Sequence, residues 1–424
     1  MKDEGKVDLV ILSNGPGEIA TWVRPVVKCV RQKLTSANSL VRISVVLSPC
    51  PHSTGREAAI ASGYPEVDRV LPPENFWAFL LWGKTTDNWQ WSDRGLVVFL
   101  GGDQFYTVAI AKRLGYSSLI YAEWAARWYR FVDRFAAMSP RVVEKVPPSY
   151  RHKVAVVGDL MANAAEELAE TDSLATLAKS DLPVVGLLVG SKSAKLAQGV
   201  PLCMAIADRL RQKQPQVRFI IPVAPTLDLT TLSKYASLQD NPLISVLGNV
   251  EGRLIADRET NSIPYLVTSG GTKIELIAQF PAYQQLANCQ ICLTTVGANT
   301  AELTSLAIPM LVLLPTQQLD AMRSWDGLPG ILANLPGVGT ILAKLINWLV
   351  LKQGRLFAWP NIWAGREIVP ELVGKLQPEN LAQLVSDYLD NPDRLQSMKD
   401  SLKAVRGETG AANRIADIIR QEII

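Results

Sequence analysis

Residues 294–309 read TTVGANTAELTSLAIP, and this stretch decides the expected fold. The run that leads into it is short, apolar and β-branched, which is typical of a buried strand. The small residues Gly297, Ala298 and Asn299 make a turn, after which the apolar spacing becomes helical. In such a unit, free backbone N–H groups and the positive helix end face a bound diphosphate. Glu302, one turn into the helix, could accept hydrogen bonds from both hydroxyls of a ribose. The alternative is an ordinary turn with a solvated glutamate.

The length and composition describe a globular protein with more than one domain. The chain has 424 residues, of which 48% are hydrophobic and 20% charged, so two or three domains are expected. A net charge of +3 is too small to indicate nucleic-acid binding. No apolar run reaches the roughly 18 residues of a membrane-spanning helix. The charged N-terminus passes directly into an apolar strand, so no secretory signal is expected and a cytoplasmic location is favoured.

Cysteine and histidine are scarce, and this limits the possible chemistry. The 5 cysteines follow no metal-binding or disulfide spacing, which fits buried thiols in a reducing compartment. With only 2 histidines, a histidine-rich metal site is excluded, and no metal is expected. A catalytic base must therefore be sought mainly among the carboxylates.

A first strand–turn–helix unit opens the chain. Residues 7–13, VDLVILS, form an apolar strand that ends in a turn containing Asn14, Gly15 and Gly17. The turn resembles the opening of a dinucleotide-binding fold but lacks the third glycine of that fingerprint, so an oxidoreductase is disfavoured. We expect this turn to bring the backbone close to a sugar or phosphate of an acceptor.

Carboxylates that follow strands of the first half are the candidate bases. Asp103 stands after the strand 95–102, at the strand end where ligands gather in open α/β sheets. It could take a proton, cap the helix that follows, or do both. Glu18 and Glu123, which follow other strands, are the alternatives for the base. Just beyond them, Arg127 could hold a phosphate of the acceptor or lie on a solvated face.

An aromatic segment, NFWAFLLWGKTTDNWQW, occupies residues 75–91. Tryptophan favours places that are apolar at one end and wet at the other, such as a membrane interface or an acyl-chain pocket. Phe76, Trp77, Phe79 and Trp82 are therefore candidates for contact with a lipid acceptor or a membrane surface. The alternative is a core helix followed by an aromatic loop.

The second half begins a new series of strands and helices. The strand 182–190 runs into GSKSAK, where Gly190, Ser191 and Lys192, with Lys195, are candidates for contact with a diphosphate. The spacing is not that of a P-loop. The segment 171–181 is polar and is expected to be a linker.

Two segments near the C-terminus add further candidates. Residues 360–372, PNIWAGREIVPEL, form a turn in which Asn361 and Arg366 could face a phosphate. The alternative for Arg366 is a buried pair with Glu367. The apolar segment 340–351 is too short to span a bilayer and suits an interfacial or dimer-facing helix, so a homodimer through the C-terminal region is a further hypothesis.

The order of elements predicts an α/β fold with two doubly wound lobes. Each half has about six apolar strands that alternate with helices. Two such lobes with a nucleotide turn in the second are typical of GT-B glycosyltransferases, in which two Rossmann-like lobes face a central cleft. The expected division is 1–170 for an acceptor-binding lobe with the Trp-rich membrane-facing segment, 171–400 for a nucleotide-sugar-binding lobe, and 401–424 for a C-terminal helix.

Several stretches resemble lipid A disaccharide synthase, in the order in which that family has them: FLGGD, VVGDLMANA, LLVGSKSA, VGANTAELTSLAIPM, PNIWAGREIVPEL and QPENLA. The resemblance is strongest over 154–384. It implies an inverting transfer from UDP-2,3-diacylglucosamine to 2,3-diacylglucosamine 1-phosphate, with release of UDP. It also implies peripheral association with the inner face of the cytoplasmic membrane and no required metal or cofactor.

The resemblance assigns residues by their place in these motifs. The family's essential aspartate falls on Asp103, and its membrane-contact region falls near Phe76 to Trp82. Its uridine-diphosphate contacts fall on Gly190, Ser191, Gly297, Glu302, Asn361 and Arg366. Lys192, Ala298 and Asn299 lie within the same two turns.

This chain departs from the family pattern at four places. Lys192 replaces an arginine and so loses the bidentate fork, and Asp159 replaces a histidine. The first turn lacks the family's serine-glycine-aspartate, and 261–272 looks like an insertion. UDP-sugar use remains the expectation, whereas the acyl-glucosamine specificity stays open. The alternatives are another UDP-sugar-dependent glycolipid synthase, a nucleotide-sugar epimerase, or an inactive membrane-associated scaffold.

Overall fold

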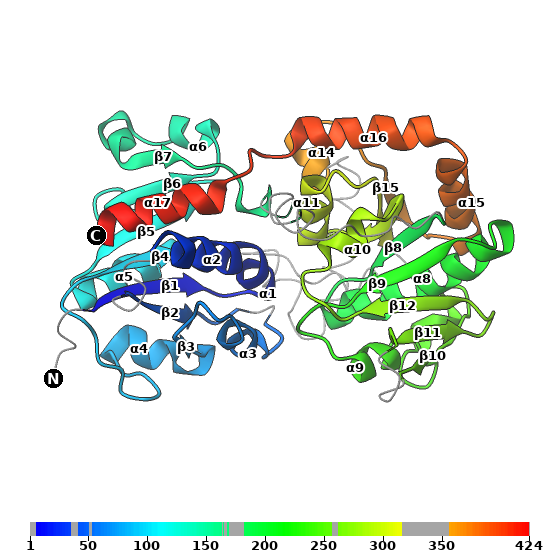
Figure 1. The fold of residues 1–424 in the computed structure, drawn as a ribbon, viewed down its shortest axis with the longest axis horizontal. Helices are drawn as coiled ribbons and strands as arrows, with labels where there is room; N and C mark the ends of the chain where they lie inside the picture. Colours follow the sequence, from blue (N-terminus) through cyan, green and yellow to red (C-terminus); the bar gives the residue numbers. More distant parts are fainter. Residues whose placement is uncertain are drawn as a thin grey trace, which may run out of the picture. The chain divides into compact units, whose positions relative to one another are not determined.

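The computed structural model describes residues 6–34, 41–50, 53–162, 164, 168, 182–256, 262–315 and 356–423. The chain divides into two compact units, Met1–Glu167 with Gly407–Ile424, and Leu168–Arg406 (Figure 1). The C-terminal segment expected as one helix is two. Helix α16 (Pro392–Val405) belongs to the second unit, and α17 (Ala411–Ile423) packs on α2 (Arg24–Lys33) of the first.

The first unit contains a fully parallel sheet of seven strands in the order β3-β2-β1-β4-β5-β6-β7. Its strands are β1 (Val7–Ser13), β2 (Val41–Leu47), β3 (Arg69–Leu71), β4 (Gly95–Phe99), β5 (Ser117–Ala122), β6 (Arg134–Ala137) and β7 (Val154–Val156). Its other helices among the described residues are α1 (Pro16–Glu18), the π-helix η1 (Ile19–Val23), α3 (Glu57–Ser62), α4 (Phe76–Trp82), α5 (Gln104–Leu114) and α6 (Pro140–Glu144), with short 3-10 turns at Pro73–Asn75, Pro148–Lys153 and Leu160–Ala162. The strand predicted at 7–13 is confirmed with the same bounds.

Both faces of this sheet are covered, which explains why the middle of β1, Leu9 to Leu12, is a continuous apolar run. Leu9 and Ile11 pack into one cluster with residues of α2 and α17. Val10 and Leu12 pack into the opposite cluster with residues of α4 and α5. Alternate side chains of a strand point to opposite faces, so a strand buried on both faces needs a continuous apolar run.

The second unit contains an eight-stranded sheet in the order β10-β11-β12-β9-β8-β13-β14-β15. Its strands are β8 (Val184–Leu188), β9 (Arg218–Pro222), β10 (Gly252–Ile255), β11 (Tyr265–Thr268), β12 (Lys273–Ile277), β13 (Ile291–Thr295), β14 (Met310–Pro315) and β15 (Glu371–Gly374). Its remaining helices include α8 (Ser193–Lys213), α9 (Leu229–Lys234), α10 (Tyr283–Ala287), α11 (Ala298–Ser305), α14 (Trp359–Ala364) and α15 (Pro378–Leu389). The sheet is parallel from β12 to β15, and its β10–β11–β12 edge is antiparallel.

One strand that the sequence predicts is wrong. The apolar run 242–246, PLISV, predicts a buried strand, but Pro242–Ser245 form a 3-10 helix. Pro242 fixes the first position of this turn, and the Asn241 side chain accepts a hydrogen bond from the Leu243 backbone N–H at 3.3 Å. A capping asparagine followed by proline starts a helical turn, and here it outweighs the apolar run after it.

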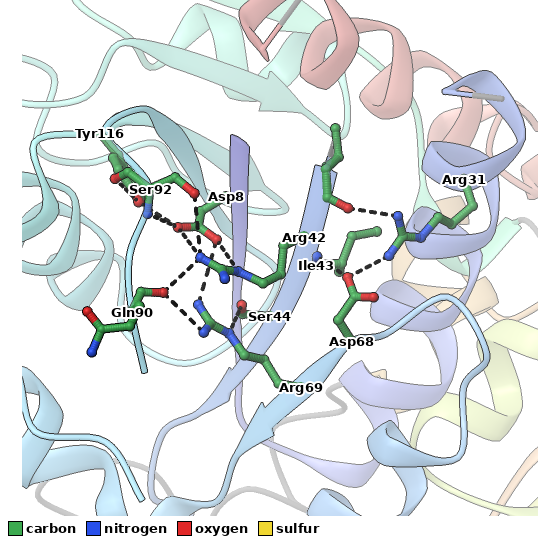
Figure 2. A network of polar contacts seen from close by, with 11 residues as sticks. Asp8, Arg31, Arg42, Ile43, Ser44, Asp68, Arg69, Gln90, Ser92 and Tyr116 are labelled. Carbon is green, nitrogen blue, oxygen red and sulfur yellow. Dashed lines mark hydrogen bonds and ion pairs between the residues drawn. The ribbon is translucent and has the colours of Figure 1, made fainter. Parts of the chain in front are cut away.

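A polar network holds the amino ends of β1, β2 and β3 together (Figure 2). Asp8 is fully buried and lies in an ion pair with Arg42, whose Nε is 2.8 Å from Asp8 Oδ1. The Tyr116 hydroxyl and the Ser92 backbone N–H donate to Asp8 Oδ2, each at 2.7 Å. Arg69 Nη2 lies 3.6 Å from Asp8 Oδ1. One buried carboxylate therefore lies against two partly buried guanidinium groups.

Two opposing effects set the protonation of Asp8. Burial alone would raise its pKa, but hydrogen bonds from Arg42, from the Ser92 backbone and from Tyr116 outweigh burial, so the net pKa is lowered. Arg69 also stacks on the aromatic segment, with its Cζ 4.2 Å from the Trp89 ring centroid and 4.6 Å from that of Trp91. The network thus fixes the loop that follows α4 as well as the strands.

We expect Asp8→Ala to lower the free energy of unfolding of the first unit by about 3–5 kcal/mol, because the change leaves buried guanidinium groups unpaired. Asp68→Ala is the matched control. Asp68 pairs with Arg31 at 2.6 Å but is 45% exposed, so its loss should cost about 1 kcal/mol. Urea unfolding of both variants measures the difference, and equal losses would contradict the role given to the network.

Candidate active site

Each sheet has a topological switch point, where the chain stops adding strands on one side of a central strand and continues on its other side. In the first sheet, the chain runs from β1 outward to β2 and β3 and then returns to β4 on the other side of β1. In the second, it runs from β8 to β9 and later returns to β13 on the other side of β8. Ligands of open α/β sheets bind beyond the carboxyl ends of the strands at such a switch point. The turns predicted as functional follow these four strands.

In the first unit, the turns after β1 and β4 touch each other. Gly101 has φ +129°, and a Cβ there would lie 3.0 Å from Asn14 Oδ1 and 3.2 Å from Glu18 Cβ. Gly102 has φ +99°, and a Cβ there would lie 2.7 Å from Ser48 Oγ. Glycine is required here by both the backbone conformation and the close approach. The GGD motif therefore brings three strand ends into contact.

Asp103 is exposed and caps α5. Its backbone is extended, and its carboxylate accepts a hydrogen bond from the Phe105 backbone N–H at 2.8 Å. The capping role predicted from the sequence is confirmed. Its role as a base stays a prediction. Arg127 is also exposed, and its backbone N–H donates to Gln104 Oε1 at 2.9 Å, which ties the Arg127 loop to the start of α5.

Two other strand-end carboxylates are in a different environment. Burial, together with the nearby Asp159 and Glu18 carboxylates, raises the pKa of Glu123 to about 7. Burial raises the pKa of Asp159 to about 6, against a hydrogen bond from the Met161 backbone N–H. Like charges in a poorly solvated site disfavour ionisation. The sequence singles out Asp159 only as a departure from the family pattern. The burial that raises its pKa depends on tertiary contacts and could not be found from the sequence.

The aromatic segment is divided between core and surface, so part of the prediction is corrected. Phe76 and Phe79 are fully buried and belong to the core under α4. Trp77 and Trp82, on the same helix, are 47% and 65% exposed. The helical period places the phenylalanines on the face toward the sheet and the tryptophans on the solvent side. Phe76 and Phe79 are therefore unavailable for lipid contact without unfolding.

Sequence reasoning missed the rest of this exposed aromatic surface. Trp77 contacts Tyr106 at 5.9 Å between ring centroids, Tyr106 contacts Phe105, and Phe105 contacts Trp128 at 5.2 Å. Phe105 and Trp128 are 45% and 42% exposed, and the nearby Phe131 is 63% exposed. Phe105 is the second residue of α5, two positions after the capping residue Asp103. Among the described residues, no helix is both long and apolar enough to cross a membrane.

In the second unit, two left-handed glycines flank a lysine. Gly190, after β8, has φ +85°, and Gly297, after β13, has φ +140°. A Cβ at Gly297 would lie 3.0 Å from Lys195 Nζ, and one at Gly190 would lie 3.2 Å from Lys195 Cδ. Lys195 Nζ donates a short hydrogen bond to the Val296 carbonyl. Thr295 Oγ1 is buried beside Gly190 and has no hydrogen-bond partner among the described residues.

The charges at this turn suit an anion. Burial, together with the neighbouring Lys192, lowers the pKa of Lys195 to about 8. An added negative group would offset both effects. Helix α11 begins at Ala298, two residues earlier than expected, and Gly297 at its N-cap provides no side-chain cap. The first backbone N–H groups of α11 are thus left without a side-chain partner.

Glu302 lies in α11, and its surroundings raise its pKa. The cause is burial, which brings the pKa of Glu302 to about 7. Thr300, on the same helix, links α11 to α14, because its Oγ1 donates to the Gly297 carbonyl at 2.9 Å and accepts from the Trp359 backbone N–H at 3.2 Å. This contact brings the turn at 360–372 to the helix that carries Glu302.

Asn361 is fully buried, and its amide is saturated by the protein. Its Nδ2 donates to the Val369 carbonyl at 2.9 Å and to Glu371 Oε1 at 2.8 Å, and its Oδ1 accepts from two backbone N–H groups, those of Ile368 and Val369. The Asn361 side chain therefore stabilises the turn through these hydrogen bonds, and its amide is not free to contact UDP. Arg366 is exposed, so the alternative of a buried pair with Glu367 is wrong.

Some predictions fall outside the described residues. These are the linker at 171–181 and the dimer-facing helix at 340–351. Of the segment 261–272, which was read as an insertion, residues 265–268 form β11 and residues 269–272 connect it to β12 in an antiparallel hairpin. The remaining residues predicted for the two turns, Gly15, Gly17, Ser191 and Asn299, lie at the switch points described above.

Solved structures with a similar fold are nucleotide-sugar enzymes. The UDP-GlcNAc 2-epimerase from Neisseria meningitidis bound to UDP-GlcNAc matches with a TM-score of 0.52 and 15% identity, over 98% of this chain and 99% of that one. A putative UDP-N-acetylglucosamine 2-epimerase from Listeria monocytogenes matches with a TM-score of 0.51 and 15% identity, over 98% and 97%. The chain has the GT-B-like fold of two α/β units, as predicted.

Sequence relatives narrow the class further. No family model matches the chain. The lipid-A-disaccharide synthase of Geobacter metallireducens is 24% identical over 328 residues, 73% of this chain and 70% of the relative. That of Nitrosococcus oceani is 23% identical over 228 residues, 54% and 44% respectively. The chain is a GT-B glycosyltransferase-like protein and a divergent relative of the lipid-A-disaccharide synthases.

The raised pKa of Glu123 has a consequence for stability. Its folded pKa of about 7 lies above the ordinary value of 4.5, so the folded state binds the proton more tightly and wild-type stability is lost as pH rises between these values. Glu123→Gln lacks this loss. We expect its stability relative to wild type to increase by up to about 3 kcal/mol between about pH 4 and about pH 8.

Calorimetric unfolding of the first unit across this pH range measures the effect. Glu144→Gln, at the exposed end of α6, is the control and should show no pH-dependent gain. A pH-independent difference between Glu123→Gln and wild type would contradict the environment described for Glu123.

Proposed function

We propose that the protein is an inverting glycosyltransferase that moves a sugar from a UDP-sugar to a lipid-linked acceptor. The observation that carries this is the opposite charge of the two switch points. The first unit gathers the carboxylates Glu18, Asp103 and Glu123, whereas the second has Lys192 and Lys195 beside a helix start. Carboxylates suit proton removal from an acceptor, and cations suit a diphosphate leaving group.

The favoured substrates are those of the relatives' family. We propose UDP-2,3-diacylglucosamine as donor and 2,3-diacylglucosamine 1-phosphate as acceptor, giving a lipid A disaccharide-type product and UDP. Another UDP-sugar-dependent glycolipid synthase is the alternative, because Lys192 and Asp159 stand where the family pattern has arginine and histidine. An inactive scaffold is less well supported, since both charged turns are retained.

The exposed aromatic surface supports a lipid acceptor. Trp77, Trp82, Phe105, Trp128 and Phe131 are each more than 40% exposed. Clustered exposed aromatic side chains on a protein surface mark an interaction site, and tryptophan is the residue preferred where apolar and aqueous phases meet. We propose that this surface rests on the cytoplasmic face of the membrane and receives the acyl chains, close to Asp103 at the start of α5.

Chemically, transfer needs three events at the two turns. A carboxylate takes the acceptor's hydroxyl proton, the hydroxyl oxygen bonds to the anomeric carbon, and the bond from that carbon to the diphosphate breaks with its electron pair going to UDP. General-base assistance is worth about 10²–10⁴-fold. Lys195, Lys192, Arg366 and the α11 N–H groups would stabilise the charge that develops on UDP.

Glu302→Ala should weaken UDP binding about tenfold or more, because a carboxylate that accepts hydrogen bonds from ribose hydroxyls contributes about 1.5–3 kcal/mol. Titration calorimetry with UDP measures the dissociation constant. Glu408→Ala, an exposed glutamate of the first unit, is the matched control and should leave it unchanged. An unaltered constant in Glu302→Ala would refute the ribose contact.

The function itself is tested by product analysis. The protein is incubated with a panel of radiolabelled UDP-sugars and bacterial lipid extract, and new glycolipids are identified by mass spectrometry. We expect one UDP-sugar to yield a glycolipid together with stoichiometric UDP. A product of changed sugar configuration without a glycolipid would favour an epimerase, and no UDP binding by thermal shift would favour a scaffold.

A further inference from the structure

Glu123 lies in a buried polar cluster that the turn motifs do not include. It follows β5, two residues after Tyr121, so both side chains emerge on the same side of the sheet. The Tyr121 hydroxyl accepts a hydrogen bond from the Leu160 backbone N–H at 3.1 Å and donates to the Gly158 carbonyl at 3.4 Å. Tyr121 thus fixes the loop after β7 on either side of Asp159.

The π-helix η1 closes this cluster from another side. Trp22 lies in η1 and packs edge-on against Tyr121, with ring centroids 5.3 Å apart. Its residue is only 7% exposed, and its indole N–H has no hydrogen-bond partner among the described residues. Single-turn π-helices occur often at functional sites, and a buried donor that has no partner among the described residues is open to a bound ligand or water. Glu18, at the start of η1, acts on the same carboxyl group of Glu123.

The loop that carries Asp159 is fixed independently of its charge. Asp159 Oδ1 accepts a hydrogen bond from the Met161 backbone N–H at 2.8 Å. A Cβ at Gly407 would lie 2.7 Å from Asp159 Cβ, so the chain entering α17 packs tightly on this residue. The aspartate is 7% exposed. Its carboxylate is therefore held beside Glu123 by contacts that an asparagine would also make.

Asp103 and Glu123 differ in what their carboxylates can do. Asp103 is exposed and already accepts from the Phe105 backbone, so water and a cap share its lone pairs. Glu123 is partly buried, at the end of the strand next to β4, among groups that favour its protonated form. A base works best when its proton affinity matches the working pH. The environment of Glu123 provides this match at neutral pH.

We propose that Glu123, at the end of β5, is the group that takes the acceptor's hydroxyl proton, and that Asp159, on the loop held by Tyr121, is its positioning residue. This proposal rests on the transferase function proposed above. The proton moves from the acceptor oxygen to a Glu123 carboxylate oxygen, and the acceptor oxygen forms the new bond to the anomeric carbon. UDP leaves with the electron pair of the broken bond, and Glu123 returns its proton to solvent before the next turnover.

The charged groups around the pair come from several elements. Glu18 faces Glu123 from α1, and Trp124 hydrogen-bonds to the Glu123 carboxylate. Lys145, after α6, donates to the Trp124 carbonyl at 3.4 Å. Arg414 of α17 donates to the Val157 carbonyl at 2.6 Å and pairs with Glu408 at 4.0 Å. The described residues contain no cluster of three or more His, Cys, Asp or Glu placed to bind a metal ion.

The first arm of the test needs no substrate. Carboxyl absorption is followed by difference infrared spectroscopy between about pH 5 and about pH 9 in wild type, Glu123→Gln and Asp159→Asn. Glu302 and Asp159 also contribute carboxyl absorption that changes near this range, so we expect Glu123→Gln to lose the amplitude of one group and to keep the rest. In Asp159→Asn, the Glu123 component should move about one pH unit lower. An unchanged titration in Glu123→Gln overturns the proposal.

The second arm measures transfer with the donor and lipid found in the product screen. Glu123→Gln should lose at least about 10²-fold in kcat and keep its UDP dissociation constant. Asp159→Asn should move the acidic limb of the kcat/KM profile to lower pH by about one unit while the plateau holds, and Asp159→Glu should restore the limb. A purely structural role for Asp159 would lower the rate equally at every pH.

Asp103→Asn is the comparator, because the family resemblance places the essential aspartate, the first candidate for the base, at Asp103. A loss of about 10²-fold or more in Asp103→Asn, with Glu123→Gln within about tenfold of wild type, would return the role to Asp103 and overturn the proposal. If wild type transfers no sugar from any donor, the proposed function fails and the base assignment with it. The infrared arm then still decides whether Glu123 and Asp159 interact as described.

Discussion

The arrangement depends on a geometric constraint of parallel sheets, in which the chain must leave a central strand in opposite directions. At β1 and β4, and again at β8 and β13, the neighbouring connections diverge and leave backbone turns uncovered at the carboxyl edge. Turns that close together leave no room for side chains. Glycine therefore occupies the positions where chains meet, as at Gly101 and Gly297, and backbone N–H groups remain available to a ligand.

Burial then gives the two turns their different chemistry. In the first unit it raises the pKa of Glu123, and in the second it lowers the pKa of Lys195, so both groups titrate closer to neutral pH than they would in water. The same physical cause favours a proton on the Glu123 carboxyl of one unit and an added anion beside Lys195 of the other. A reaction that removes a proton and releases a diphosphate uses both properties. The polar network around Asp8 lies at the opposite, amino edge of the first sheet and serves stability instead.

Much of the fold follows from sequence patterns, because buried parallel strands need continuous apolar runs. The strand 7–13, the unit at 294–309 and the capping by Asp103 were all predictable from local patterns. The strand predicted at 242–246 failed because capping by Asn241 favours a helical turn. Burial depends on tertiary contacts, so the sequence could not separate the buried Phe76 from the exposed Trp77, nor reveal the environment of Asp159.

The central claim is that the second unit binds a uridine nucleotide at the two turns that follow β8 and β13. Amide hydrogen exchange of the whole protein with and without UDP tests this most directly, since bound phosphate protects the N–H groups it accepts from. We expect protection at 190–195 and 296–302, and none in the strands of the first sheet. Unchanged exchange in both turns at saturating UDP, or protection confined to other segments, would contradict the account.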